Sequence, residues 1–145
     1  MSLFSALSVS ASGMAAQRAR AELLVENLAN AETTRTPEGG PYRRKDVVFT
    51  TQQQASPFAA TFQTQLDQNS VGVGISQVVV DTSAPDRRYQ PGHPDADAEG
   101  YVSFPKVHPA EDMVDLMSAS RSYQANVAAM GAVKDMIQRS LDLLR

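Results

Sequence analysis

The chain contains no cysteine and no tryptophan, and only 6% of its 145 residues are aromatic. The absence of cysteine excludes disulfide bonds and thiolate metal sites. With so few aromatic side chains, the core is expected to be aliphatic and thin. The length is short for more than one independent core, because domains usually contain about 100–150 residues. We therefore expect one folded unit with extensions.

Long apolar runs and an excess of positive charge are also missing. No stretch approaches the roughly 18 apolar residues that a membrane-spanning helix needs, so we predict no direct membrane insertion. Residues 1–16 lack a basic start, and serines interrupt their apolar positions, so we interpret them as mature protein rather than as a signal peptide. The formal net charge is −3. A chain without a positive field is not expected to bind nucleic acid.

A first helix is predicted over residues 3–30, which contain no proline. Apolar residues recur there in alternating steps of three and four, which is the spacing of one helix face. Gly13 weakens this helix, because glycine costs about 1 kcal/mol relative to alanine in a helix interior, and Arg18 interrupts the face. We expect this helix to need a partner. Its apolar face consists of Phe4, Leu7, Ala11, Met14, Ala21, Val25 and Leu28.

The middle of the chain, residues 31–106, contains every proline except Pro109, together with short runs of β-branched residues. Turn-rich stretches separate these runs, which predicts a small β-rich module. The polar, glutamine-rich residues 51–70 are interpreted as a loop whose role stays open. Residues 72–74 are interpreted as a bend before a strand, because Gln77 stands where a dinucleotide loop needs its third glycine. The predicted strands are residues 46–50, 75–81 and 101–104.

A second helix is predicted from Pro109 to Arg145, because proline suits the first turn of a helix. Two apolar stripes follow this helix, and together they form an arc wider than one partner helix needs. The stronger stripe repeats at every seventh residue, as in a helix-packing seam, and consists of Leu116, Tyr123, Met130, Ile137 and Leu144, with Met113, Val127 and Leu141 beside them. The second stripe consists of Val114, Met117, Ala125, Ala128, Ala132 and Met136.

Together these elements predict an α+β fold with an antiparallel, coiled-coil-like stalk. Residues 1–31 and residues 109–145 supply its two helices, and residues 32–108 form the β-rich middle module. A two-helix stalk would leave the second stripe in water, so we expect further chains to cover it. The residues predicted to lie at subunit interfaces are Leu7, Met14, Val25, Leu28, Leu116, Met117, Tyr123, Ala128, Met130, Ala132, Ile137, Leu141 and Leu144.

No credible catalytic, cofactor or metal site is present, so the chain is not expected to be an enzyme. An acidic loop that ends in Gly100 resembles the start of a calcium loop, but Lys106 stands where the closing glutamate should be. His93 and His108 have no second histidine at metal-ligand spacing. An enzyme built on a carboxylate cluster stays open as a lesser alternative, and its candidate residues are Asp95, Asp97 and Glu99.

Several stretches resemble a known family. NLANA at residues 27–31, with SGMAAQ at residues 12–17, resembles the N-terminal motif of flagellar rod, hook and hook-associated axial proteins. Three further stretches are similar to proximal-rod proteins of the FlgC type: PYRRKDVVF at residues 41–49, PGHPDADAEGYV at residues 91–102 and MVDLMSASRSYQANV at residues 113–127. The resemblance spans nearly the whole chain. Its motif residues include Asn27, Leu28, Ala29, Asn30, Ser120, Arg121, Tyr123, Gln124 and Asn126.

The resemblance implies a structural subunit of the bacterial flagellar basal body. Such a subunit polymerises through its terminal helices into the proximal rod, which is the drive shaft and export-channel wall between motor and hook. It also implies a periplasm-spanning location and export by the flagellar type III apparatus without a cleaved signal peptide. The implied partners are further copies of the chain, rod proteins of the FlgB, FlgF and FlgG types, the adaptor FliE and the basal-body ring proteins.

Besides the lesser alternative of an enzyme, the residues alone leave a rival from another functional class. The chain could be a monomeric periplasmic binding or interaction module, in which the β-rich region grips a ligand and the helices cap it. Hydrogen exchange separates the two hypotheses. Fully protected helical amides in the monomer favour the binding module, whereas labile terminal helices favour a subunit that orders on assembly.

Overall fold

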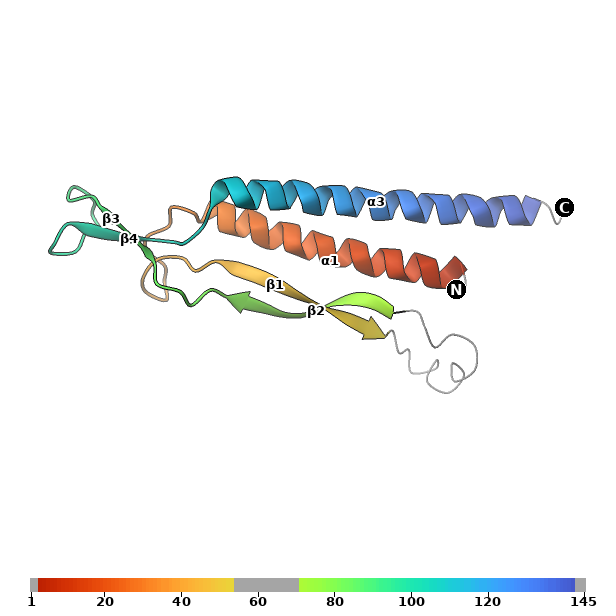
Figure 1. The fold of residues 1–145 in the computed structure, drawn as a ribbon, viewed down its shortest axis with the longest axis horizontal. Helices are drawn as coiled ribbons and strands as arrows, with labels where there is room; N and C mark the ends of the chain where they lie inside the picture. Colours follow the sequence, from red (N-terminus) through yellow and green to blue (C-terminus); the bar gives the residue numbers. More distant parts are fainter. Residues whose placement is uncertain (1–2, 54–70, 143–145) are drawn as a thin grey trace.

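The computed structural model describes residues 3–53 and 71–142, and two long helices run along its length (Figure 1). Residues 54–70 of the predicted loop lie outside these ranges, and so does Leu144, one of the predicted interface residues. The elements confirm the α+β class, with terminal helices on either side of a β-containing middle. They are helix α1 (Leu3–Ala29), strands β1 (Lys45–Gln53), β2 (Val71–Val80), β3 (Asp86–Tyr89) and β4 (Tyr101–Phe104), and helix α3 (Pro109–Asp142).

α1 forms the central layer of the long part of the molecule (Figure 1). α3 packs antiparallel against one side of α1, and the β1–β2 hairpin packs against another side. β3 and β4 lie at the end of the molecule where α1 ends and α3 begins. The strands of the middle region thus form two separate two-stranded sheets, of which one lies along the stalk and the other lies beyond it.

The β1–β2 hairpin is longer than the sequence pattern predicts. Its strands pair antiparallel, with one irregularity after Val48. β1 continues to Gln53, so residues 51–53 belong to a strand and not to the predicted loop. β2 begins at Val71, so residues 72–74 belong to a strand and not to the predicted bend.

The glycines of β2 allow this hairpin to lie against α1. Gly72 is buried, and a Cβ atom at this position would lie 2.9 Å from Ser12 Oγ. Ser12 Oγ accepts a hydrogen bond of 3.0 Å from the N–H of Val73 and donates one of 2.7 Å to the carbonyl of Val9. A larger side chain at Gly72 would therefore push the hairpin away from the helix.

The β3–β4 hairpin contains the strand that matches its prediction, β4, and a strand that was not predicted, β3. All four side chains of β3 are exposed, so its sequence lacks the apolar alternation that usually marks a strand. Contacts between cations and rings hold it instead: the guanidinium of Arg87 lies 5.0 Å from the ring centre of Tyr101, and that of Arg88 lies 4.8 Å from the ring centre of Phe104.

The acidic loop between β3 and β4 is organised by one carboxylate. Asp97 Oδ1 accepts hydrogen bonds from the N–H groups of Tyr101 at 2.8 Å and Glu99 at 3.0 Å. These bonds hold the pKa of Asp97 below its usual value. No cluster of histidine and acidic side chains suited to a metal ion occurs in residues 3–53 and 71–142, and no helix in these ranges is long and apolar enough to cross a membrane.

Small residues bring α1 and α3 together. Ala119 of α3 is 1% exposed and Ala16 of α1 is 3% exposed. A Cβ atom on Gly13 would lie 3.1 Å from the side-chain nitrogen of Asn126, so the two helices approach closely at this level. Phe4 and Val25, which belong to the apolar face predicted for α1, are instead among its exposed side chains.

Candidate assembly surface

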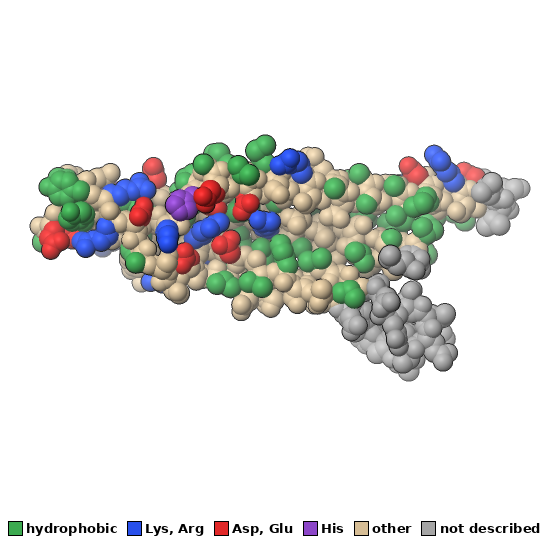
Figure 2. All heavy atoms as spheres, in the orientation of Figure 1, with side chains coloured by type: hydrophobic (Ala, Val, Ile, Leu, Met, Phe, Trp, Pro, Cys, Tyr) green, Lys and Arg blue, Asp and Glu red, His purple; other side chains and the backbone are tan. Residues whose placement is uncertain are grey.

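The exposed surface of α3 carries many large apolar side chains. Met117 and Val114 are each 62% exposed. Figure 2 shows hydrophobic side chains spread along α3, whereas most charged side chains gather near β3, β4 and the start of α3, with a smaller group near the end of α3. Contiguous exposed apolar surface is uncommon on monomeric soluble proteins and is typical of interaction sites. The other large hydrophobic side chains exposed on α3 are Met113, Tyr123, Val127, Met136 and Leu141.

The second stripe lies on the side of α3 that faces away from α1. Asp112, Ala119 and Val133 are the buried side chains of α3, and they mark the side that packs against α1. Ala128 follows Ala119 by about two and a half helical turns, which places it on the opposite side of the helix. All six residues of the second stripe are exposed.

The predicted interface residues divide into two sets by exposure. One set is half-buried within the chain and consists of Leu7, Met14, Leu28, Leu116, Met130 and Ile137. The other set is exposed and consists of Val25, Met117, Tyr123, Ala128, Ala132 and Leu141. Their contact with other subunits stays a prediction.

A buried asparagine connects α1 to the start of β1. Asn27 is 0% exposed. Its Oδ1 accepts hydrogen bonds from the N–H of Lys45 and from the hydroxyl of Tyr42, each 2.9 Å long, and its Nδ2 donates to the carbonyl of Lys45 at 2.8 Å. The side-chain amide thus pairs with both polar backbone groups of one residue. The family resemblance singled out Asn27 as a motif residue but did not indicate this role.

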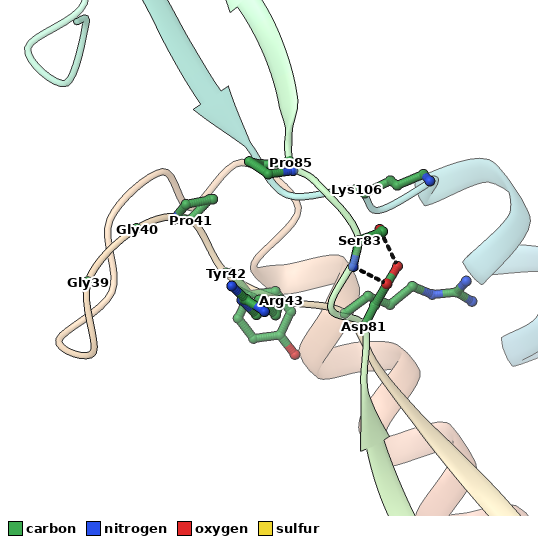
Figure 3. A pocket seen from close by; sticks show the side chains of 10 residues that line it. Gly39, Gly40, Pro41, Tyr42, Arg43, Asp81, Ser83, Pro85 and Lys106 are labelled. Carbon is green, nitrogen blue, oxygen red and sulfur yellow. Dashed lines mark hydrogen bonds between the residues drawn. The ribbon is translucent and has the colours of Figure 1, made fainter.

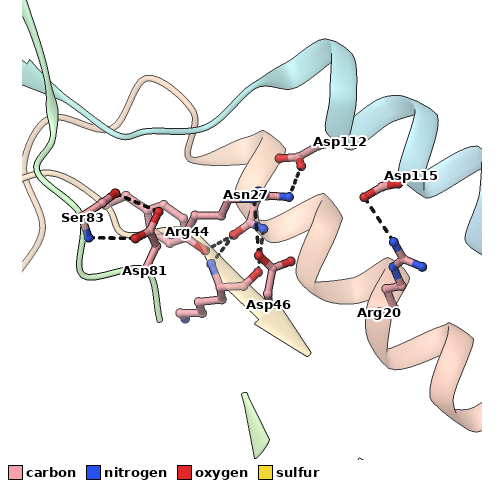
Figure 4. Close-up of polar contacts among 10 residues, drawn as sticks. Arg20, Asn27, Arg44, Asp46, Asp81, Ser83, Asp112 and Asp115 are labelled. Carbon is pink, nitrogen blue, oxygen red and sulfur yellow. Dashed lines mark hydrogen bonds and ion pairs between the residues drawn. The ribbon is translucent and has the colours of Figure 1, made fainter. Parts of the chain in front are cut away.

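An ion pair connects the same region to the start of α3. Arg44 Nη2 donates to Asp112 Oδ1 at 2.8 Å, and Asp112 is 1% exposed (Figure 4). Burial raises the pKa of Asp112, and the positive charge of Arg44 opposes that effect. A second pair, between Arg20 and Asp115 at 3.2 Å, links α1 to α3 directly. We call the group formed by Asn27, Tyr42, Arg44, Lys45 and Asp112 the joint.

Tyr42 is the aromatic member of the joint and is 9% exposed. Burial, together with the nearby charge of Glu26, raises the pKa of Tyr42 to about 12. Glu26 also forms an ion pair with Lys45 Nζ. The joint therefore fixes the angle between α1, α3 and the β1–β2 hairpin through contacts that involve all three elements.

A small hollow lies beside the joint (Figure 3). Its volume is about 100 Å³, whereas sites for small ligands usually measure about 300–1,000 Å³. Asp81 accepts hydrogen bonds from the N–H and hydroxyl of Ser83 at its edge, which lowers the pKa of Asp81. The hollow has room for water but not for a typical ligand. It is lined by residues 39–44, Asp81, Ser83, Pro85 and Lys106.

Comparisons with known proteins relate the sequence to flagellar rod proteins. A sequence model described as the C-terminal region of flagellar basal body rod FlgEFG proteins matches residues 98–143. The chain is 42% identical to the flagellar basal-body rod protein FlgC of Bacillus subtilis, over 99% of both chains. It is 43% identical to FlgC of Escherichia coli O157:H7, over 99% of this chain and 98% of that protein.

A third relative, FlgC of Borreliella burgdorferi, is 37% identical over 100% of this chain and 99% of its own length. The helical architecture and these matches define a flagellar basal-body rod protein. The chain belongs to the FlgC family of such proteins.

Proposed function

We propose that this chain is a structural subunit of the flagellar proximal rod and polymerises through α1 and α3. The observation that supports the proposal is the exposed apolar side of α3, which points away from α1 and therefore has no partner helix within the described part of the chain. Burying apolar surface contributes about 25 cal/mol per Å². Neighbouring subunits that cover Val114, Met117 and Met136 would gain this contribution at every contact.

The composition of the helix surfaces suits a stiff wall. Alanines such as Ala11 and Ala15 on α1, and Ala128 and Ala132 on α3, are exposed and allow helix backbones to approach closely. Interiors packed in this way have low compressibility and transmit strain. A wall of such helices would transmit torque from motor to hook and would surround the export channel.

The proposal includes a location and a set of partners. The subunit would stand in the periplasm-spanning rod, after export by the flagellar type III apparatus without a cleaved signal peptide. It would contact further copies of itself, rod proteins of the FlgB, FlgF and FlgG types, the adaptor FliE and the basal-body ring proteins. Its role would be structural and non-catalytic.

Substituting both alanines of the second stripe tests the proposal. Ala128→Gln together with Ala132→Gln should leave the monomer's helicity and melting temperature nearly unchanged, because glutamine is a good helix former and both positions face water. In a polymer, the larger side chains should separate neighbouring helices, at a cost of about 1–3 kcal/mol per site. We expect loss of rod assembly and motility in complemented cells.

The control is Ala98→Gln, in the exposed loop before β4, which should assemble and swim normally. If the Ala128→Gln, Ala132→Gln protein assembles normally, the second stripe faces solvent in the rod. That result would refute its role as the assembly surface.

A further inference from the structure

One charged residue interrupts the apolar side of α3. Between Leu116 and Val133, Arg121 is the only charged residue. Arg121 is exposed and makes no ion pair with another residue of the described ranges. An arginine in the middle of an apolar contact surface is costly to bury without an acidic partner. A chain that covers this side of α3 is therefore favoured when it presents a carboxylate to Arg121.

The side of α1 that faces away from α3 and the hairpin offers one such carboxylate. α1 contains two acidic residues. One of them, Glu26, is engaged with Lys45 at the joint. The other, Glu22, forms an exposed pair with Arg18 at 2.9 Å, in which the two side chains are 64% and 76% exposed. The other exposed residues on this side of α1 are apolar or small and include Phe4, Ala11, Ala15, Val25 and Ala29.

We propose that the exposed side of α3 in one copy packs against the exposed side of α1 in the next copy, and that Arg121 pairs there with Glu22 of the partner subunit. This inference rests on the proposed polymerisation and names its contact. The two surfaces match in chemistry, because each is apolar with one charged site in its middle. Arg18 and Arg121 would then lie on either side of one carboxylate, in a charge-assisted contact of high specificity.

The positions of the two surfaces determine the kind of assembly. They lie on different helices and face different directions, so the contact is head-to-tail and adds subunits without limit unless the array closes on itself. Within one chain, Gly13 lies level with Asn126 and Arg20 with Asp115. Along the axis of the stalk, Arg121 therefore stands at about the same height as residue 16 of α1, close to Arg18.

Two copies at the same height would therefore bring Arg121 next to Arg18, and the two cations would repel each other. Moving one copy along the stalk by about six residues, or about 9 Å at 1.5 Å per residue, brings Arg121 to Glu22 instead. The charges thus favour an axially staggered, open array over a flat ring.

Reversing the two charges tests the contact. Arg121→Glu alone and Glu22→Arg alone should each reduce rod incorporation at least tenfold, measured by quantifying the subunit in isolated basal bodies. The double variant, Arg121→Glu with Glu22→Arg, should restore incorporation, because the opposite charges face each other again. Circular dichroism of each purified protein should match the wild type. Normal incorporation of Arg121→Glu would overturn the proposal.

The proposal would also be overturned if both single variants fold but are not incorporated into the rod, and the double variant is not incorporated either. The α3 surface would then be covered by another protein. If a charge-reversal variant does not fold, cysteine pairs replace it, since the chain has no cysteine of its own. Cysteines at positions 22 and 121 should cross-link between subunits with a short bis-maleimide, more efficiently than cysteines at 18 and 121. The reverse order, or no cross-linking between copies, would contradict the proposal.

The two proposals can fail separately. If Arg121→Glu assembles normally while the glutamine substitutions at positions 128 and 132 block assembly, the rod function stands and the contact with Glu22 is wrong. If the glutamine substitutions are also harmless, the assembly surface itself is wrong.

Discussion

Asn27 connects a helix to a strand by imitating a strand. Its amide carbonyl and amino groups pair with the N–H and carbonyl of Lys45, as the backbone of a neighbouring strand would. No other amino acid of similar size offers one acceptor and one donor in this geometry, because aspartate lacks the donor and leucine lacks both. The side chain of Asn27 thus joins the end of α1 to β1, beside the ion pair between Glu26 and Lys45.

Replacing Asn27 by alanine should therefore destabilise the monomer by about 3 kcal/mol or more. The substitution leaves the backbone groups of Lys45 and the hydroxyl of Tyr42 without their partner in a buried place, and each such group costs about 1–3 kcal/mol. Urea unfolding of the purified protein measures the effect. The matched control is Asn30→Ala, because Asn30 bonds only locally, to Glu26 and Thr33. Equal losses for both variants would contradict the role of Asn27.

Tyr42 is expected to make the free energy of unfolding fall as the pH rises in the alkaline range. Its pKa is raised to about 12 in the folded state, whereas an unfolded tyrosine ionises near pH 10. Between these values the unfolded chain loses the proton first, so unfolding becomes more favourable as the pH rises. The contribution of Tyr42 is complete below about pH 10 and is lost by about pH 12, with a total of about 2 kcal/mol.

Denaturant titrations at several pH values between 8 and 12 check this prediction. The Tyr42→Phe protein should be less stable at pH 8, because Asn27 loses a hydrogen bond, but its stability should fall less steeply toward pH 12. An unchanged slope in the Tyr42→Phe protein would show that other groups cause the alkaline loss.

At the scale of elements, α3 has two sides with different tasks. One side packs against α1, and Met130 and Ile137 lie half-buried there. The opposite side, with Ala128 and Ala132, is exposed. A substitution on the first side should affect the monomer, and one on the second side should affect assembly alone.

We expect Met130→Asp or Ile137→Asp to loosen α3 from α1 and to abolish incorporation into the rod. A carboxylate there faces an apolar neighbourhood without a partner, which costs about 1–3 kcal/mol at a half-buried site. The β3–β4 hairpin, at the other end of the molecule, should keep its chemical shifts in NMR spectra. Gln138→Asp, at an exposed position of α3, serves as the control. Unchanged motility of the Met130→Asp strain would contradict the prediction.

The helices could be predicted well because their signals are local. The spacing of apolar residues and Pro109 place both helices, and α1 ends within one residue of its predicted limit. The surfaces through which α1 and α3 contact each other were predicted less well. The sequence pattern favours the largest apolar residues, whereas close approach depends on small ones, such as Gly13, Ala16 and Ala119, that carry little hydrophobic signal.

The strands depend on partners that the sequence does not display. β3 consists of charged residues and tyrosine, and it is held by rings and cations of β4 rather than by an apolar face. Gly72 and Gly74 looked like a bend, because the residues that crowd them, Ser12 of α1 at Gly72 and Gln52 of β1 at Gly74, lie far away in the sequence. The joint was missed for the same reason, since Asn27, Arg44 and Asp112 meet only after folding.

At the scale of the whole molecule, contacts are distributed unevenly along the stalk. The joint and the β3–β4 hairpin lie at one end of the α1–α3 pair, and the β1–β2 hairpin runs beside α1, whereas the last part of α3 extends past the start of α1 (Figure 1). In the monomer, that part has few neighbours, and Met136 and Leu141 are about half exposed or more.

Hydrogen exchange of the purified monomer should therefore show a gradient along α3. Amides near Asp112 and Ala119 should exchange slowly, and amides after Lys134 should exchange quickly, because local opening is easiest where few buried contacts exist. In isolated rods the same C-terminal amides should become protected. Uniform protection along α3 in the monomer would instead favour the self-contained binding module.

The pairing of α1 with α3 has a consequence for the order in which the molecule folds. Gly13 lies near the beginning of the chain and Asn126 near its end, yet they meet in the stalk. Contacts between such distant residues close a long loop and form late. A chain that leaves a narrow channel from one end to the other could complete its stalk only after both helices had emerged. Transport would then come first and polymerisation second, without any separate inhibitor to hold the subunits apart.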